Sequence, residues 1–428
     1  MDTAVVTPLD DELLTALRAQ SPTGEVQYFQ LPESTDLSAI PQDPKNPLSP
    51  EKVALGQLLF HETGLALNPK HISAIETYSC ASCHFAGAGF QANRFQGIAD
   101  GGLGFGINGE GRVRGNHYDR SEIDVQPLRT PSAMNLAYQK NVLWSGQFGA
   151  TGANIGTEDQ WTPETPKAVN ELGFEGLETQ AIAGLSVHRQ QPDSEFFTKY
   201  PEYMPLFDRA FPELPADERY NIVNTGLAIG AYERTLLANQ APFQQWIAGD
   251  MSAMNEQEKE GALLFFTKGQ CVDCHSGPSL ANMEFHALGM SDLIDCPEEI
   301  FQVTETNGMF GRGGFTKDPA DDYTFKVPQL YNLEDSKFLG HGSSFRSVEE
   351  VIRYKNEARP QNPRVPEDRL SEKFVPLGLS DSEIDAIAAF IRTGLRDPNL
   401  ARYEPSSVLS GNCFPNNDPL SRQDRGCE

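Results

Sequence analysis

Hydrophobic residues recur at helical spacing in two similar segments, residues 49–60 and 255–265. In the first, Ser49 is a helix-capping residue, and Pro50 suits the first helical position because its missing N–H is not needed there. In the second, Asn255 is the capping residue. Both segments then read Gly-x-Leu-Leu-Phe. The pattern therefore predicts two equivalent helices.

A second pair of helical patterns lies further along the chain, at residues 228–235 and 386–393. Ser380, with Glu383 three residues later, forms a capping box before the last of these helices. Each member of this pair follows one member of the first pair. The order of opening helix, loop and closing helix therefore occurs twice.

The loops between these helices also match. Residues 129–136 and 326–333 both read basic-x-Pro-x-x-x-Asn-Leu. Counting nine residues on from each asparagine reaches Trp144 in the first copy and His341 in the second. The chain therefore contains an internal repeat of one structural unit.

Each copy of the repeat also contains a Cys-x-x-Cys-His sequence, the motif for covalent haem attachment, at residues 80–84 and 271–275. Together the repeat and the motifs predict a mostly α fold with little β structure, built from two cytochrome c-like haem domains in tandem. We expect an N-terminal arm on the surface, a first haem domain, a second haem domain, and a tail that packs back on the first domain. The predicted boundaries are residues 1–47, 48–245, 246–395 and 396–428.

The chemistry of each half centres on a Cys-x-x-Cys-His motif. Two cysteines at this spacing form thioethers to the haem vinyl groups, and the following histidine is the proximal ligand of the iron. A shared zinc site is excluded, because neither motif has a second Cys-x-x-Cys pair at zinc-finger spacing. The predicted cofactors are two covalently bound c-type haems, held by Cys80, Cys83 and His84 and by Cys271, Cys274 and His275.

Composition restricts the partners. The chain has 34 Lys and Arg residues against 60 Asp and Glu residues, a net charge of −26. Nucleic acid is therefore excluded as a partner, whereas a small basic redox protein would be attracted electrostatically. No apolar run approaches the length of roughly 20 residues that a membrane span needs.

The remaining cysteines indicate the compartment. Cys413 and Cys427 close a short loop in the tail, where a disulfide fits an oxidising space, and Cys296 is expected to be free. Because haem attachment of this kind takes place outside the bacterial cytoplasm, we expect a periplasmic protein. The first residues have neither a basic nor an apolar region, so we infer that a signal peptide has been replaced by Met1.

Residues 48–395 resemble the bacterial dihaem cytochrome c peroxidase family, which includes the MauG-type enzymes. The resemblance rests on the order of Leu-Leu-Phe-His-Glu, Ser-Cys-x-x-Cys-His, Arg-Thr-Pro-Ser, Leu-Trp-Ser-Gly and Phe-Lys-Val-Pro. It implies a peroxide-reacting haem in the N-terminal domain and an electron-transfer haem in the C-terminal domain. It also implies a tryptophan between the haems, here Trp144, and a calcium ion near the domain interface.

The repeat suggests which iron is open. Ala183 and Gly184 in the first half align with Tyr354 and Lys355 in the second. Adjacent residues of a helix point about 100° apart, so only one of Tyr354 and Lys355 can be the sixth ligand of the second haem. The first haem is expected to have an open sixth position, since Ala and Gly cannot bind iron.

The predicted catalytic residues depart from the family pattern. Gln180 matches the family's distal glutamine, but Gln190 stands where its catalytic glutamate belongs, and glutamine cannot transfer protons. We expect His188 to act as the distal acid–base group, with Arg189 stabilising developing charge. His117 is a weaker candidate, for a histidine ligand that leaves on reduction.

The predicted function is that of a dihaem peroxidase. Hydrogen peroxide would react at the first haem, and a small cytochrome or copper protein would supply electrons through the second haem and Trp144. One alternative is MauG-like oxidation of side chains in a partner protein. Another is a dihaem electron carrier without peroxide chemistry. A homodimer is a further expectation.

Overall fold

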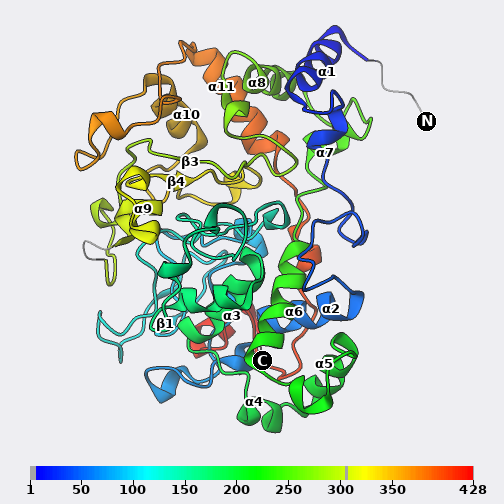
Figure 1. Ribbon diagram of the computed structural model, residues 1–428, viewed down its shortest axis with the longest axis vertical. Coiled ribbons are helices and arrows are strands. Elements are labelled where there is room, and N and C mark those ends of the chain that lie inside the picture. Colours follow the sequence, from blue (N-terminus) through cyan, green and yellow to red (C-terminus); the bar gives the residue numbers. More distant parts are fainter. Residues whose placement is uncertain (1–5, 304–306, 428) are drawn as a thin grey trace.

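The computed structural model describes residues 6–303 and 307–427. Its α-helices are α1 (Pro8–Gln20), α2 (Pro50–His61), α3 (Gly176–Val187), α4 (Ser194–Lys199), α5 (Met204–Ala210), α6 (Ile222–Arg234), α7 (Pro242–Ile247), α8 (Glu256–Phe266), α9 (Gly311–Thr316), α10 (Val348–Glu357), α11 (Asp381–Ala389) and α12 (Pro419–Arg425). A π-helical turn, Phe390–Gly394, continues α11. The predicted mostly α fold is confirmed (Figure 1).

Strands are short in the described part of the chain. β1 (Gly102–Leu103) pairs antiparallel with β2 (Val113–Arg114), and β3 (Phe285–His286) pairs antiparallel with β4 (Phe325–Lys326). Each ladder has two residues per strand, so each pair fixes only the ends of a loop. The prediction of little β structure is also confirmed.

The predicted helix starts are confirmed by their caps. The side chain of Ser49 accepts a hydrogen bond from Lys52 N at the start of α2. Asn255 and Ser380 form full capping boxes at the starts of α8 and α11. These caps satisfy backbone N–H groups that have no partner inside the helix.

The opening and closing helices of each half cross at a glycine. A side chain at Gly56 of α2 would overlap the carbonyl oxygen of Ala228 in α6. In the second half, a side chain at Gly261 of α8 would overlap the carbonyl oxygen of Ala386 in α11. Figure 1 shows α2 beside α6 in its lower part and α8 beside α11 in its upper part. The repeated sequence thus forms the same close helix crossing twice.

The matching loops also adopt the same backbone. Asn135 and Asn332, at equivalent positions, both have left-handed φ angles, 58° and 56°. Equivalent antiparallel bridges follow, from Val142 to Phe148 and from Leu339 to Phe345. The repeat therefore extends from the helices to the loops that separate them.

Within the predicted N-terminal arm, helix α1 packs its apolar face on the second half of the chain. Its residues Leu13 and Leu17 are fully buried, and α1 contacts α8 of the second half. Asp10 accepts a hydrogen bond from Trp246 Nε1 at 2.8 Å and pairs with Lys259 Nζ at 2.7 Å. An apolar helix face gains free energy by leaving water, and here the face of α1 covers the second half.

The C-terminal tail contacts the first half of the chain. Ser82 Oγ donates to the carbonyl of Pro415 at 3.1 Å, beside the first haem motif. Arg112 and Asp418 form a buried ion pair at 3.4 Å. Two backbone N–H groups, those of Phe105 and Gly106, donate to Asp424. These contacts hold the tail across the loops that follow the first motif.

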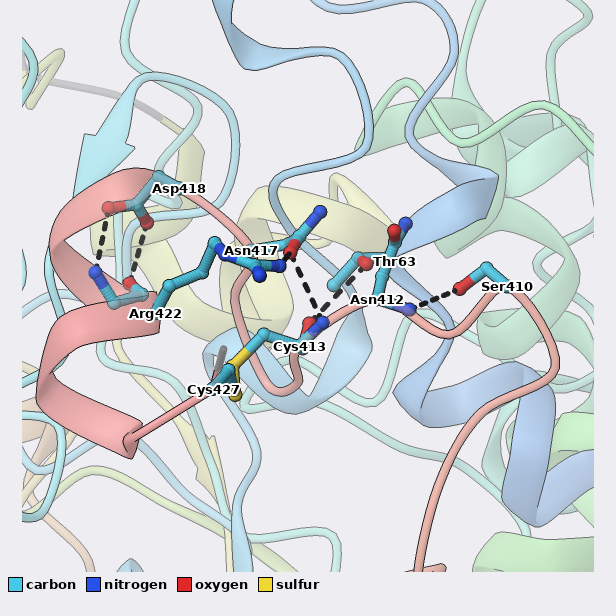
Figure 2. Close-up of a disulfide and its surroundings, with 9 residues drawn as sticks. Thr63, Ser410, Asn412, Cys413, Asn417, Asp418, Arg422 and Cys427 are labelled. Atoms are coloured by element: carbon cyan, nitrogen blue, oxygen red, sulfur yellow. Dashed lines mark hydrogen bonds between the residues drawn. A yellow bond between two sulfur atoms is a disulfide. The ribbon is translucent and has the colours of Figure 1, made fainter.

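The predicted disulfide joins Cys413 and Cys427 and closes α12 onto the tail (Figure 2). The backbone N–H of Cys413 donates to Asn417 Oδ1 at 3.1 Å, and Thr63 Oγ1 donates to the Cys413 carbonyl at 3.5 Å. Cys296 is free, as expected. In the described part of the chain, every helix is too short or too polar to cross a membrane.

Candidate active site

The two Cys-x-x-Cys-His motifs form similar turns. Each begins with a 3₁₀ turn, Cys80–Ser82 in the first half and Cys271–Asp273 in the second. The backbone N–H of His84 donates to the Cys80 carbonyl at 3.1 Å, and that of His275 donates to the Cys271 carbonyl at 2.8 Å. In the second half Cys271, Cys274 and His275 all line one cavity, as haem attachment requires, and in the first half His84 lines the same cavity.

Both proximal histidines are oriented by a backbone carbonyl. The Nδ1 atom of His84 lies 3.1 Å from the carbonyl oxygen of Phe90, and that of His275 lies 3.0 Å from the carbonyl oxygen of Leu280. Burial lowers the pKa of each imidazole to about 4. Each ring is therefore neutral at pH 7, with Nδ1–H donating and the Nε2 lone pair available for iron.

One cavity connects the two halves. It has a volume of about 300 Å³, and both His84 and His275 line it. Trp144, Gln180 and Lys355, three of the residues that the sequence predicted, also line it. The cavity therefore brings both iron ligands and the predicted inter-haem tryptophan to one space.

Trp144 is held between equivalent loops of the two halves. Its Nε1–H donates to the carbonyl of Arg129 at 2.7 Å, and its own carbonyl accepts from the N–H of Lys326 at 2.8 Å. The N–H of Arg129 in turn donates to the carbonyl of His341 at 2.8 Å. The Trp144 and His341 rings meet edge to face, with centroids 6.2 Å apart. Equivalent residues of the repeat thus exchange hydrogen bonds across the interface between the halves.

Two buried cations line the cavity at equivalent positions of the repeat. Arg129 donates to Gln91 Oε1 at 2.8 Å, and Lys326 Nζ donates to Gln139 Oε1. Burial lowers the pKa of Arg129 to about 9 and that of Lys326 to about 7. Neither cation pairs with a carboxylate among the described residues.

Three donor atoms beside these cations also lack an acceptor within the described residues: Arg129 Nε, Gln91 Nε2 and Gln139 Nε2. All three side chains line the cavity. Buried donors without acceptors are unfavourable, so these donors and the two cations favour an acceptor-rich group in the cavity. The propionate carboxylates of two haems have this chemistry, and the residues therefore fit the cofactor that the motifs predict.

Two predicted catalytic residues lie outside the lining of this cavity. His188 Nδ1 lies 2.9 Å from Asp124 Oδ2, and Arg189 donates to Asp100 Oδ2 at 2.6 Å. Burial alone would lower the pKa of His188, but the Asp124 carboxylate raises it above its ordinary value. His117 is exposed at the surface. Gln180 is thus the predicted distal residue that faces the cavity.

Helix α10 distinguishes Tyr354 from Lys355. Val348, Val351, Ile352 and Lys355 all line the cavity, and their spacing marks a single helix face. Tyr354 points elsewhere: its hydroxyl donates to the carbonyl of Leu288 at 2.6 Å, and its ring packs on neighbouring phenylalanines. Lys355 therefore shares the wall of the cavity with His275, and Tyr354 does not.

Sequence reasoning missed Glu233, which lines the cavity together with His84 and Gln180. Burial raises the pKa of this carboxyl to about 8. The signal was present in the sequence, because Glu233 is an acid in the apolar segment that predicted α6. A buried acid at a cavity wall is a typical feature of a functional site.

The fold and the paired haem-attachment motifs define a dihaem c-type protein. Residues 50–252 match the family described as di-haem cytochrome c peroxidase. This part of the chain matches the family, the chain as a whole is similar to MauG and to cytochrome-c peroxidases, and the protein is an oxidoreductase enzyme of the peroxidase type. The family implies two c-type haems, and the similarity to named peroxidases favours an enzyme over the alternative of a carrier without peroxide chemistry.

Two relatives are similar to the chain over most of its length. The methylamine utilization protein MauG of Methylorubrum extorquens is 27% identical over 377 residues, covering 86% of this chain and 84% of its own. The cytochrome-c peroxidase IdrP1 of Denitromonas iodatirespirans is 25% identical over 392 residues, covering 87% and 88%. Among solved structures, a MauG-like protein associated with microbial copper homeostasis has a TM-score of 0.58 at 22% identity, covering 87% of this chain and 96% of its own.

Proposed function

We propose that this protein reduces hydrogen peroxide at the haem of His84, with electrons arriving through the haem of His275 and Trp144. The supporting observation is the single cavity that both histidines and Trp144 line. The haems, when bound, supply the redox centres and the iron that meets peroxide. In this proposal residues 48–245 form the peroxidatic domain and residues 246–395 the electron-transfer domain, while residues 1–47 and 396–428 are the arm and tail.

The first-half pocket would be formed by α3 and the loop after it. Gln180 faces the cavity from α3, and its amide can both donate to and accept from a bound peroxide. We assign His188 as the acid–base group, with its ring oriented by Asp124 at 2.9 Å. Arg189, paired with Asp100, would add positive charge beside this pocket.

We propose Lys355 as the sixth ligand of the second haem. It lies on the cavity-lining face of α10, and burial lowers the pKa of its ammonium. An amine with a lowered pKa more readily offers the lone pair that a metal needs. An amine ligand should hold this haem at a lower potential than a methionine would.

The electron donor is proposed to be a small basic redox protein in the periplasm. The net charge of −26 supports electrostatic attraction of such a partner, and the Cys413–Cys427 disulfide supports an oxidising compartment. The MauG-like alternative, oxidation of side chains in a partner protein, is supported by the similarity to MauG. The calcium ion and the homodimer stay predictions.

The test compares two substrates with one preparation of the haem-loaded protein. We expect peroxide to be consumed catalytically when a reduced small cytochrome or cupredoxin is supplied. Steady consumption only when a protein substrate becomes oxidised would instead support the MauG-like alternative. No consumption with either would contradict the proposal.

A further inference from the structure

Glu233 is a buried carboxylic acid without a partner. Its side chain lies near the end of α6, is 6% exposed and lines the cavity with His84 and Gln180. Among the described residues that line this cavity, it is the sole Asp or Glu. Its Oε2 atom has no hydrogen-bond partner within the described chain. A carboxyl in such a place is stable only if it is neutral or if the cavity supplies a partner.

Glu233 also lies close to the attachment point of the first haem. Burial, followed by the effect of the Glu233 carboxyl, raises the pKa of the Cys80 thiol to about 12. The same Cys80 sulfur contacts Gln190 Oε1 at 3.6 Å. Gln190 and Glu233 therefore both lie near Cys80. Gln190 cannot carry a proton, so Glu233 is the titratable one of these two side chains.

The charges that face Glu233 largely compensate one another. Glu178 of α3 raises its pKa and Arg234 of α6 lowers it, and these two form a fully buried ion pair at 2.7 Å. Tyr232 precedes it on α6, and burial keeps that phenol neutral by raising its pKa. Burial is therefore the main cause of the raised pKa of Glu233, about 8.

We propose that Glu233 is the redox-linked proton site of the first haem. When one electron from an external reductant converts the ferric iron to ferrous, the Glu233 carboxylate takes one proton from water and becomes a carboxylic acid. No other bond forms or breaks. The proposal rests on haem bound at His84, and so on the dihaem site of the proposed function.

The physical reason is electrostatic. Reduction makes the haem one unit more negative, and at low dielectric a nearby carboxylate is then disfavoured against its neutral form. The carboxyl therefore has a higher pKa beside the ferrous haem than beside the ferric haem. Between these two pKa values each electron brings a proton, so the reduction potential falls as the pH rises.

The test is a set of spectroelectrochemical titrations of the first haem, without peroxide, from pH 6 to pH 10. We expect the potential of the parent protein to fall with pH within this range, and to be flat over the same interval in Glu233→Gln. Glu404→Gln is the matched control. Burial also raises the pKa of Glu404, but this residue lies outside the cavity lining, so the control should keep the parental slope.

The proposal would be overturned if the potential of the first haem in Glu233→Gln fell with pH as steeply as in the parent protein. Haem content and circular dichroism show whether the variant folds. If it does not fold, the infrared difference spectrum of the parent between its reduced and oxidised states decides. A carbonyl band of a protonated carboxyl that shifts in D₂O is expected, and its absence would also overturn the proposal. Because no peroxide is present, this result is independent of whether the protein is a peroxidase.

Discussion

The carbonyl oxygen of Trp144 accepts a hydrogen bond from the backbone N–H of Lys326, 2.8 Å away. This bond ties the predicted inter-haem indole of the first half to the loop of the second half. Trp144 Nε1 is bound at 2.7 Å to the carbonyl of Arg129, the repeat equivalent of Lys326. Trp144 is therefore held through both its backbone carbonyl and its indole ring.

Replacing Trp144 by Phe should slow electron exchange between the haems while both haems stay bound. Phenylalanine keeps an aromatic ring but loses the Nε1–H bond to Arg129 and is harder to oxidise than an indole. The measurement is rapid-mixing spectroscopy of a sample reduced at one haem. Trp161→Phe is the control, because Trp161 is buried outside the cavity lining. Equal rates in the parent and both variants would make Trp144 a packing residue only.

Replacing Lys355 by Ala should convert the second haem to high spin, whereas Tyr354→Phe should not. Lys355 lines the cavity and Tyr354 does not, although both side chains donate to a backbone carbonyl, Lys355 Nζ to Lys373 and the Tyr354 hydroxyl to Leu288. Electron paramagnetic resonance of the ferric protein measures the spin state. A high-spin second haem in Tyr354→Phe would reverse the assignment. If neither variant changes the spectrum, Met309, which also lines the cavity, is the next candidate.

Replacing His188 by Ala should slow the reaction with peroxide by about 10² to 10⁴, the usual contribution of general acid–base catalysis. As a base, His188 must be unprotonated, so the parental rate should rise with pH through its pKa. Asp124 raises that pKa above roughly 6.5. Asp124→Asn should therefore lower the pKa of His188 and move the rise in rate to lower pH. If His188→Ala kept the parental rate and pH profile, the pair of His188 and Asp124 would be structural only.

Replacing Gly56 or Gly261 by Ala should destabilise the fold. The new methyl group would overlap a backbone carbonyl of the crossing helix, which cannot rotate away. Overpacking of this kind costs about 1 to 3 kcal/mol, and more where backbone must shift. Denaturant unfolding of the haem-loaded protein measures it. Gly230→Ala is the control, since its nearest atom would lie 3.3 Å away. A loss in the control equal to that in Gly56→Ala would refute the crossing argument.

The features that the sequence predicts well are local. The haem motifs, the capping residues Ser49, Asn255 and Ser380, and the Cys413–Cys427 bridge depend on residues close together in the chain, or on a known chemical requirement. The repeat also allowed one long-range prediction, that the matching loops of the two halves occupy equivalent positions beside the two haems.

The features that could not be predicted from the sequence depend on packing between distant segments. The apolar face of α1 could be recognised, but not the surface of α8 that it covers. Glu233 belongs to an apolar helix, and only its position at the cavity wall separates it from an ion-paired core acid such as Glu178. The choice between Tyr354 and Lys355 required the rotation of α10 about its axis, which the sequence pattern left open.

The central claim is that peroxide reacts at the first haem and draws electrons from both. The most direct measurement mixes the haem-loaded protein, reduced at the second haem, with one equivalent of hydrogen peroxide and follows both Soret bands in a stopped-flow instrument. We expect rapid reoxidation of the second haem, and a change in the Soret band of the first haem in the same reaction. Soret bands that stay unchanged over seconds at this peroxide concentration would contradict it.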